Sequence, residues 1–92
     1  MKDYYFVLGI PSTAPLSEVK KAFRQKASEF HPDRNTSEIA PEKFREVREA
    51  YDVLSDDAAR AAYDENRRRN LLEDPLQTAT EFWKNYLSGV LQ

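Results

Sequence analysis

The fold is decided by residues 17–54, which read SEVKKAFRQKASEFHPDRNTSEIAPEKFREVREAYDVL. Each end of this stretch carries apolar side chains at helical spacing, and the two stripes are separated by a polar middle that contains His31-Pro32-Asp33. We expect two helices that bury their stripes against each other as an antiparallel pair. The first stripe comprises Val19, Ala22, Phe23, Ala27 and Phe30, and the second comprises Phe44, Val47, Tyr51 and Leu54.

The segment between the stripes, residues 31–41, has the composition of a connecting loop. It contains two prolines and a run of three turn-favouring polar residues at 35–37. Pro32 disfavours helical dihedral angles at His31, which predicts that the first helix ends just before it. We therefore expect His31, Pro32 and Asp33 at the tip of a helical hairpin, exposed to solvent and rigid at the proline. Such a position suits recognition.

The remaining pattern predicts an all-α fold. Asp3 can cap a short first helix that stops at Gly9. Pro15 suits the first turn of the next helix because its missing N–H is not needed there. Ser55-Asp56-Asp57 ends the hairpin and recaps the chain for a short fourth helix. The helices are predicted, in chain order, at about residues 4–8, 16–30, 41–54 and 58–65.

The segment after residue 66 is predicted to be separate from a domain of residues 1–66. It begins with three consecutive arginines at 67–69 and continues as a polar linker. Thr78 and Glu81 have the spacing of a capping box, which predicts a last amphipathic helix over roughly 79–91. That helix could pack on the domain, offer its apolar face to a partner, or lead into further chain. Residues 67–92 are thus interpreted as a linker and a C-terminal amphipathic helical tail.

The composition of the 92 residues limits the class of protein. Hydrophobic residues make up 40%, enough for one modest core in a single domain. A net charge of −2 argues against a generally cationic nucleic-acid binder. The absence of cysteine excludes disulfides and thiolate metal sites and fits a reducing compartment. With no signal-peptide pattern and no apolar run of transmembrane length, a cytoplasmic location is expected.

A helical wheel over residues 16–30 places a basic strip opposite the apolar stripe. Lys20, Lys21 and Arg24 share the solvent-facing side. Most charged strips are simply solvated helix faces. Beside a rigid polar loop, however, this strip would suit an acidic protein partner through electrostatic steering. Lys26 falls on the apolar side, where its stem can lie on the core edge while its ammonium group reaches water.

The residues do not combine into a catalytic, metal or phosphate site. His31 and Asp33 could form an acid–base couple, but no cysteine or second histidine completes a catalytic set. A single histidine in a cysteine-free chain lacks the usual zinc ligands. The basic strip or the arginines at 67–69 could neutralise phosphates, although the acidic overall charge disfavours nucleic acid as the partner. We expect no enzymatic activity, no metal and no cofactor.

Read together, these strings resemble the J-domain of the DnaJ (heat shock protein 40) co-chaperones. The likeness covers about residues 3–64, and its order and spacing make it specific. It implies a four-helix domain whose second and third helices form the hairpin. It also implies docking on a DnaK-type heat shock protein 70 chaperone and stimulation of that partner's ATP hydrolysis, so that clients become trapped. The matching strings are Asp3-Tyr4-Tyr5, Leu8-Gly9-Ile10, Lys20-Lys21-Ala22-Phe23-Arg24, His31-Pro32-Asp33-Arg34-Asn35, Lys43-Phe44, Glu49-Ala50-Tyr51-Asp52-Val53-Leu54-Ser55-Asp56 and Arg60-Ala61-Ala62-Tyr63-Asp64.

The resemblance also implies roles for individual residues. The family requires its His-Pro-Asp loop for stimulation, which points to His31, Pro32 and Asp33 as the trigger. The family docks through the basic face of its second helix, which corresponds here to the strip of Lys20, Lys21 and Arg24. The implied supporting residues are Arg34 and Asn35 for the loop, and Phe23, Phe44, Tyr51 and Leu54 for the packing of the hairpin.

The chain departs from the family's pattern at several positions. Lys26 replaces an expected apolar residue, Gln25 thins the basic strip, and Ala59 stands where a basic residue often precedes the arginine of the fourth helix. These departures predict a lower affinity or a different choice of partner, with the His-Pro-Asp trigger intact. The alternative interpretation is a J-like assembly module that docks on a partner without stimulating ATP hydrolysis. Neither a glycine- and phenylalanine-rich segment nor a cysteine-rich zinc module follows. We therefore expect a J-domain with its own tail, which could bind a client or a second protein.

Overall fold

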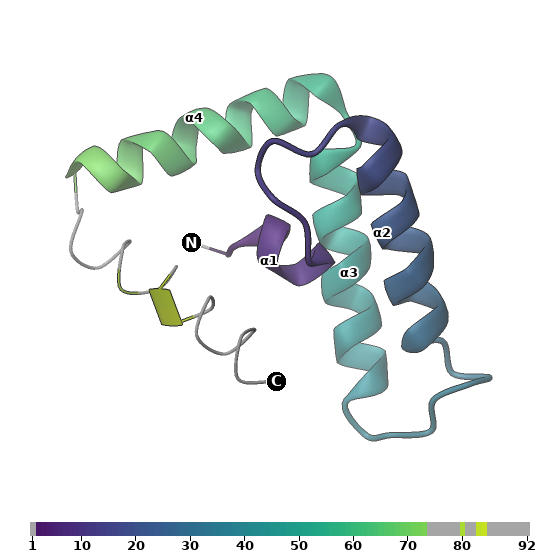
Figure 1. Cartoon of the computed structure of the whole chain (residues 1–92). Coiled ribbons are helices and arrows are strands. Elements are labelled where there is room, and N and C mark those ends of the chain that lie inside the picture. The colour runs from purple at the N-terminus through teal and green to yellow at the C-terminus, as the bar shows by residue number, and fades with distance from the viewer. Residues whose placement is uncertain (1, 74–79, 81–82, 85–92) are drawn as a thin grey trace.

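The computed structural model describes residues 2–73, 80, 83 and 84, and the described elements are four α-helices without a strand (Figure 1). Helices α2 and α3 stand side by side and antiparallel, α1 lies against them, and α4 runs away from the end of α3 (Figure 1). The predicted all-α fold with a central hairpin is confirmed. In chain order the helices are α1 (Tyr4–Leu8), α2 (Leu16–Glu29), α3 (Ala40–Leu54) and α4 (Asp57–Glu73).

Local signals in the sequence determine both ends of α1. The side chain of Asp3 accepts a hydrogen bond from the backbone N–H of Phe6 at 3.2 Å, which satisfies one of the free donors at the start of a helix. Gly9 ends the helix with a φ of 72°, a left-handed conformation that glycine adopts without steric cost. Helix α1 therefore begins and ends where the sequence predicts.

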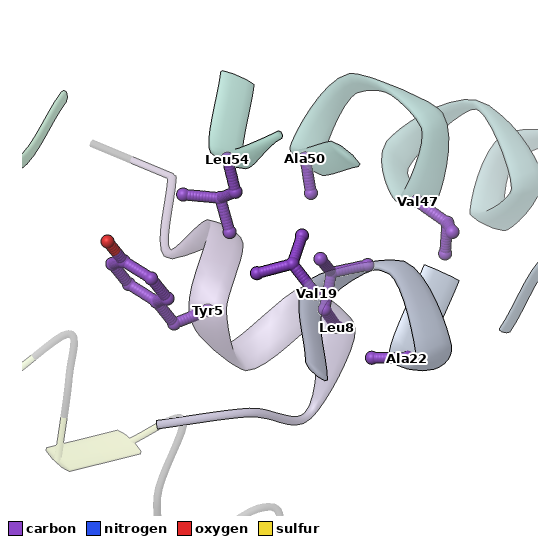
Figure 2. Packing of buried hydrophobic residues seen from close by; sticks show 7 residues of the cluster. All are labelled: Tyr5, Leu8, Val19, Ala22, Val47, Ala50 and Leu54. Atoms are coloured by element: carbon purple, nitrogen blue, oxygen red, sulfur yellow. The ribbon is translucent and has the colours of Figure 1, made fainter. Parts of the chain in front are cut away.

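The apolar core lies where α1 meets the hairpin (Figure 2). Val19 of α2 and Ala50 of α3 are completely buried, and Leu54 is 1% exposed. A five-residue helix is not stable in water by itself. Helix α1 is held because it buries Tyr5 and Leu8 in this cluster. The buried residues of the cluster are Tyr5, Leu8, Val19, Ala22, Val47, Ala50 and Leu54.

The fourth helix is longer than predicted. Helix α4 continues through the three arginines to Glu73. The prediction that this helix ends at residue 65 is therefore wrong, and so is the prediction that a linker begins at residue 67. Arginine is a good helix former, and Glu65 pairs with Arg68 at 2.8 Å and with Arg69 at 3.8 Å, three and four residues along. No residue of α4 is buried, so no apolar periodicity marks its second half. The tail helix predicted over 79–91 falls mainly outside the described residues.

Polar contacts add to the packing of Tyr63 against the core in attaching α4 to the rest of the domain. The hydroxyl of Tyr5 donates to the carboxylate of Asp64 and accepts from Arg60 Nε at 3.3 Å. The guanidinium groups of Arg60 and Arg67 lie 5.5 and 5.2 Å from the centroid of the Tyr5 ring. Arg60 also donates to two carbonyl oxygens of the loop between α1 and α2, at 3.1 and 2.7 Å. Tyr5 is therefore the residue around which α4 is anchored.

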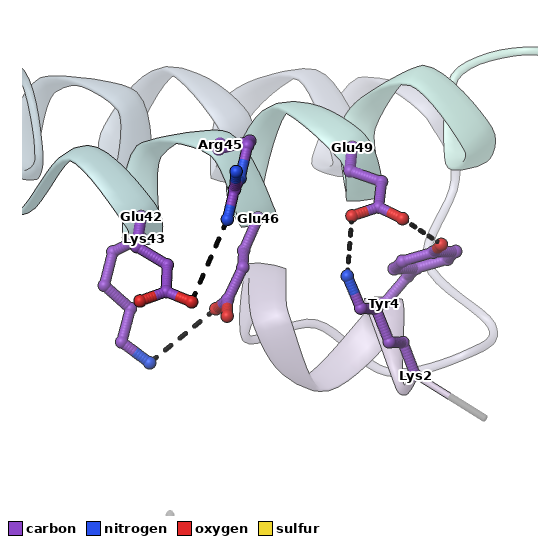
Figure 3. Close-up of polar contacts among 7 residues, drawn as sticks. All are labelled: Lys2, Tyr4, Glu42, Lys43, Arg45, Glu46 and Glu49. Carbon is purple, nitrogen blue, oxygen red and sulfur yellow. Dashed lines mark hydrogen bonds and ion pairs between the residues drawn. The ribbon is translucent and has the colours of Figure 1, made fainter. Parts of the chain in front are cut away.

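A second polar cluster fixes the residues before α1 against both α3 and α4. Glu49 of α3 accepts hydrogen bonds from Lys2 Nζ and from the hydroxyl of Tyr4, both at 2.8 Å (Figure 3). Tyr63 of α4 accepts from the N–H of Tyr4 at 3.0 Å and donates to the carbonyl oxygen of Lys2. Burial and the hydrogen bond to Glu49 raise the pKa of Tyr4 to about 12. The hydrogen bond from Lys2, followed by that from Tyr4, lowers the pKa of Glu49.

Candidate protein-binding site

The loop between α2 and α3 projects from the free end of the hairpin (Figure 1). The side chain of Asp33 is 89% exposed and that of His31 is 48% exposed. Pro32 between them is also exposed. The carboxylate of Asp33 therefore faces solvent at a corner of the molecule, where a partner can reach it.

His31 braces this corner from within. Its carbonyl oxygen accepts hydrogen bonds from the N–H groups of Arg34 and Asn35, at 3.0 and 2.9 Å. Its Nδ1 accepts from the N–H of Asp33 at 3.2 Å and lies 3.6 Å from Asp33 Oδ2. The ring also meets Phe44 edge-on, with 6.1 Å between the centroids. Through these contacts with the backbone, Asp33 and Phe44, the imidazole acts as a brace for the loop.

Two further side chains tie the loop to the end of α2. Arg34 Nη1 donates to Ser28 Oγ at 2.6 Å. Asn35 donates to the carbonyl oxygen of Glu29 at 3.2 Å, one of the acceptors left unsatisfied at a helix C-terminus. Asn35 Oδ1 in turn accepts from the N–H of Ser37 at 3.0 Å. Ser37 belongs to the turn-favouring run at 35–37, whereas no local pattern in the sequence marks Ser28 as a partner of the loop.

The residues predicted to pack the hairpin are distributed along its length. Phe44 is half-buried and meets His31 next to the loop. Phe23 of α2 and Tyr51 of α3 stack in the middle, with centroids 4.1 Å apart and planes at 20°. Leu54 lies in the core at the other end. The exposed loop therefore stands on a continuous row of aromatic and apolar contacts.

The basic strip lies on α2, the helix that leads into the loop. Lys20, Lys21 and Arg24 are exposed, and within the described part of the chain no ion pair or side-chain hydrogen bond engages them. Arg24 precedes His31 by roughly 10 Å along the helix axis. Lys26 turns away from this strip towards Glu29, 3.9 Å from its carboxylate. The loop and the strip thus present an acidic corner and three cations on one hairpin.

Other features of the described residues lie apart from this hairpin tip. A groove of about 270 Å³ between α4 and the α1–α2 loop is lined by Ser12, Asp64, Arg67, Arg68 and Leu71. In residues 2–73, 80, 83 and 84, no group of three or more His, Asp or Glu side chains is placed to hold a metal ion. None of the described helices is both long and apolar enough to cross a membrane.

Comparison with known proteins identifies the family. The family model for the DnaJ domain matches residues 3–64, from the N-cap of α1 to Asp64 in α4. This chain belongs to the DnaJ domain family. The match covers the loop, the basic strip and the core described above, and it confirms the resemblance noted in the sequence.

Relatives of this DnaJ domain occur in animals and bacteria. Over 64 residues it is 56% identical to the DnaJ homolog subfamily B member 5 of Homo sapiens and of Mus musculus, and 55% identical to the chaperone protein DnaJ of Staphylococcus aureus. These matches cover 70% of this chain but only 18% and 17% of the relatives, so the chain matches less than a fifth of their length. The solution structure of the J-domain from human DnaJ subfamily C member 12 has a TM-score of 0.67 at 28% identity, covering 91% of this chain and 75% of that one.

Proposed function

We propose that this chain is a co-chaperone that docks on a DnaK-type heat shock protein 70 chaperone and stimulates its ATP hydrolysis, without itself catalysing a reaction. The observation that carries the proposal is the carboxylate of Asp33, which is 89% exposed on a loop braced by His31. The identity of 55–56% to proteins named DnaJ over the same residues supports it. The match covers less than a fifth of those longer relatives. Stimulation of a chaperone's ATP hydrolysis by this chain is therefore a proposal.

Docking begins with the basic strip. Lys20, Lys21 and Arg24 attract an acidic surface of the partner and raise the rate of encounter. Because no intramolecular ion pair within the described residues holds these cations, none has to be broken when the partner arrives. Exposed charges are screened over about 8 Å at physiological ionic strength. Docking should therefore weaken as salt concentration rises.

Asp33 acts once the two proteins are in contact. Its carboxylate competes for a cationic group that restrains the ATP-bound state of the partner. A ligand shifts a conformational equilibrium only through different affinities for the two states, so Asp33 must bind the hydrolysis-competent state more tightly. The hydrogen bonds of His31 and Asn35 hold the loop in place before docking, which reduces the entropy lost on binding.

Single-turnover ATP hydrolysis by a DnaK-type chaperone tests this function. The wild-type chain should accelerate hydrolysis, and both His31→Gln and Asp33→Asn should abolish the acceleration. Glu38→Gln is the matched control, since it removes another exposed carboxylate of the same loop and should leave the acceleration unchanged. Absence of acceleration at saturating wild-type chain would favour the alternative, an assembly module that docks on a partner without stimulating ATP hydrolysis.

The docking strip has its own test. Lys20→Glu and Arg24→Glu should weaken binding, and the loss should shrink as salt is added. Arg45→Glu makes the same charge change at an exposed position of α3 and should have little effect on binding. Binding that does not respond to salt would contradict the role of the strip. The cytoplasmic location, a partner for the tail and the absence of nucleic-acid binding stay predictions, the last open to a gel-shift assay with DNA.

A further inference from the structure

We infer that Ile39 is an apolar anchor of the same docking surface and contacts an apolar patch of the ATP-bound chaperone beside the cationic group that Asp33 binds. This inference rests on the proposed function and names a further residue that sets affinity. Ile39 is 58% exposed. Among the described residues it is the one exposed large apolar side chain in the loop between α2 and α3. The others are Phe6, Leu16, Leu71, Leu72 and Trp83.

Ile39 is exposed although its backbone is fixed. Its N–H donates to Ser37 Oγ at 3.4 Å, and its carbonyl oxygen accepts from the N–H of Lys43 at 3.0 Å. Ser37 is itself held by Asn35, which is bonded to the end of α2. This chain of hydrogen bonds connects Ile39 to the same brace that orients Asp33. The exposure of Ile39 therefore results from a defined loop geometry.

The next residue prevents Ile39 from turning inward. Ala40 is completely buried at the start of α3, and its N–H donates to the carbonyl oxygen of Ser37 at 3.2 Å. Rotating the start of the helix to bury Ile39 would expose Ala40 and break this hydrogen bond. Burial of apolar surface is favourable, so the fold leaves at this point an apolar side chain that a partner can cover.

Location and rigidity distinguish Ile39 from an ordinary exposed apolar residue. Single exposed apolar side chains are common on protein surfaces and need no explanation by themselves. Ile39, however, shares a braced loop with an exposed carboxylate, and binding sites typically combine an apolar anchor with polar groups around it. Leu72 at the end of α4 is more exposed, at 68%, but lies outside this loop. Substitution of Leu72 is therefore a matched control for substitution of Ile39.

The experiment titrates the 92-residue chain against an ATP-bound DnaK-type chaperone and measures both binding and single-turnover hydrolysis. Ile39→Ser should raise the half-saturating concentration about fivefold, the scale of losing one aliphatic contact, and leave the plateau rate unchanged. This fivefold rise should persist at high salt because the contact is apolar. The rise in half-saturating concentration caused by Lys20→Glu should become smaller as salt is added. Leu72→Ser should change neither quantity, and Ile39→Val should restore most of the affinity.

Each outcome decides the inference. An unchanged half-saturating concentration for Ile39→Ser overturns it, and so does a lower plateau with unchanged affinity, which would make Ile39 part of the trigger. Circular dichroism melting of both serine variants excludes unfolding as the cause of a loss. If the wild-type chain binds without accelerating hydrolysis, the proposed function fails while the binding titration still decides the role of Ile39. If the wild-type chain does not bind at all, both proposals fall.

Discussion

The two ends of the α2–α3 hairpin are held by different interactions. At the end next to α1, buried apolar side chains and the polar contacts of Tyr5 connect residues that are far apart in sequence. At the free end, hydrogen bonds within residues 28–39 shape an exposed loop. The comparison indicates that stability is concentrated at one end and recognition at the other. Substitutions should therefore separate the two properties.

Leu54→Ala should produce the largest change in stability. Leu54 is 1% exposed in the core cluster, and truncating a buried leucine costs about 3 kcal/mol of the free energy of unfolding. Chemical denaturation measures this loss. Under conditions where the variant is still folded, it should accelerate hydrolysis by the chaperone like the wild type. A loss well below 1 kcal/mol would show that the core does not carry the stability of this end.

Arg60→Ala should have the next largest effect. It removes the hydrogen bonds to Tyr5 and to the α1–α2 loop together with the cation above the Tyr5 ring. Loss of a partly buried, charge-assisted set of this kind costs about 2 kcal/mol. Arg68→Ala is the control, because Arg68 is exposed and, within the described residues, pairs with its helical neighbour Glu65. It should leave stability almost unchanged. Equal effects of the two substitutions would contradict the anchoring role of Arg60.

Tyr4→Phe should have a smaller and pH-dependent effect. It removes the hydrogen bond to Glu49, worth about 1 kcal/mol at neutral pH. The pKa of Tyr4 is raised to about 12 in the folded protein, against about 10 in an unfolded chain. Its contribution is therefore complete below pH 10 and is lost as pH rises from 10 to 12. The difference between wild type and variant in the free energy of unfolding, measured by chemical denaturation, should become smaller over that pH range. A difference that stays constant with pH would contradict the hydrogen bond between Tyr4 and Glu49.

Asp33→Asn should change stability least. Its side chain is 89% exposed, and exposed substitutions of this kind usually stay within about 0.5 kcal/mol. The same variant is expected to lose all acceleration of ATP hydrolysis. Measuring both quantities on one sample gives the sharpest form of the comparison between the two ends. A stability loss comparable to that of Arg60→Ala would show that the loop also supports the fold.

Most of the hairpin and its loop could be predicted from the sequence. Helices α1, α2 and α3 have bounds within a residue or so of those expected, because caps, prolines and apolar periodicity act over a few residues. The second half of α4 could not be predicted in this way. It buries no residue, so no stripe marks it, and its arginines are typical of a polar linker as well as of a helix. The partner-binding roles of the loop and strip residues stay predictions.

The sequence by itself determined that the chain is helical and that His31, Pro32 and Asp33 stand at a hairpin tip, because these properties depend on residues that are neighbours in the chain. Only the tertiary structure decided which residues meet at the other end. Arg60 reaches Tyr5, and Tyr63 reaches Lys2, across more than fifty residues. No local periodicity encodes such contacts, since they exist only after α1 has packed on the hairpin and the side chains of α4 have reached the residues in and just before α1. The outward position of Ile39 was decided in the same way, by the burial of Ala40 beneath it.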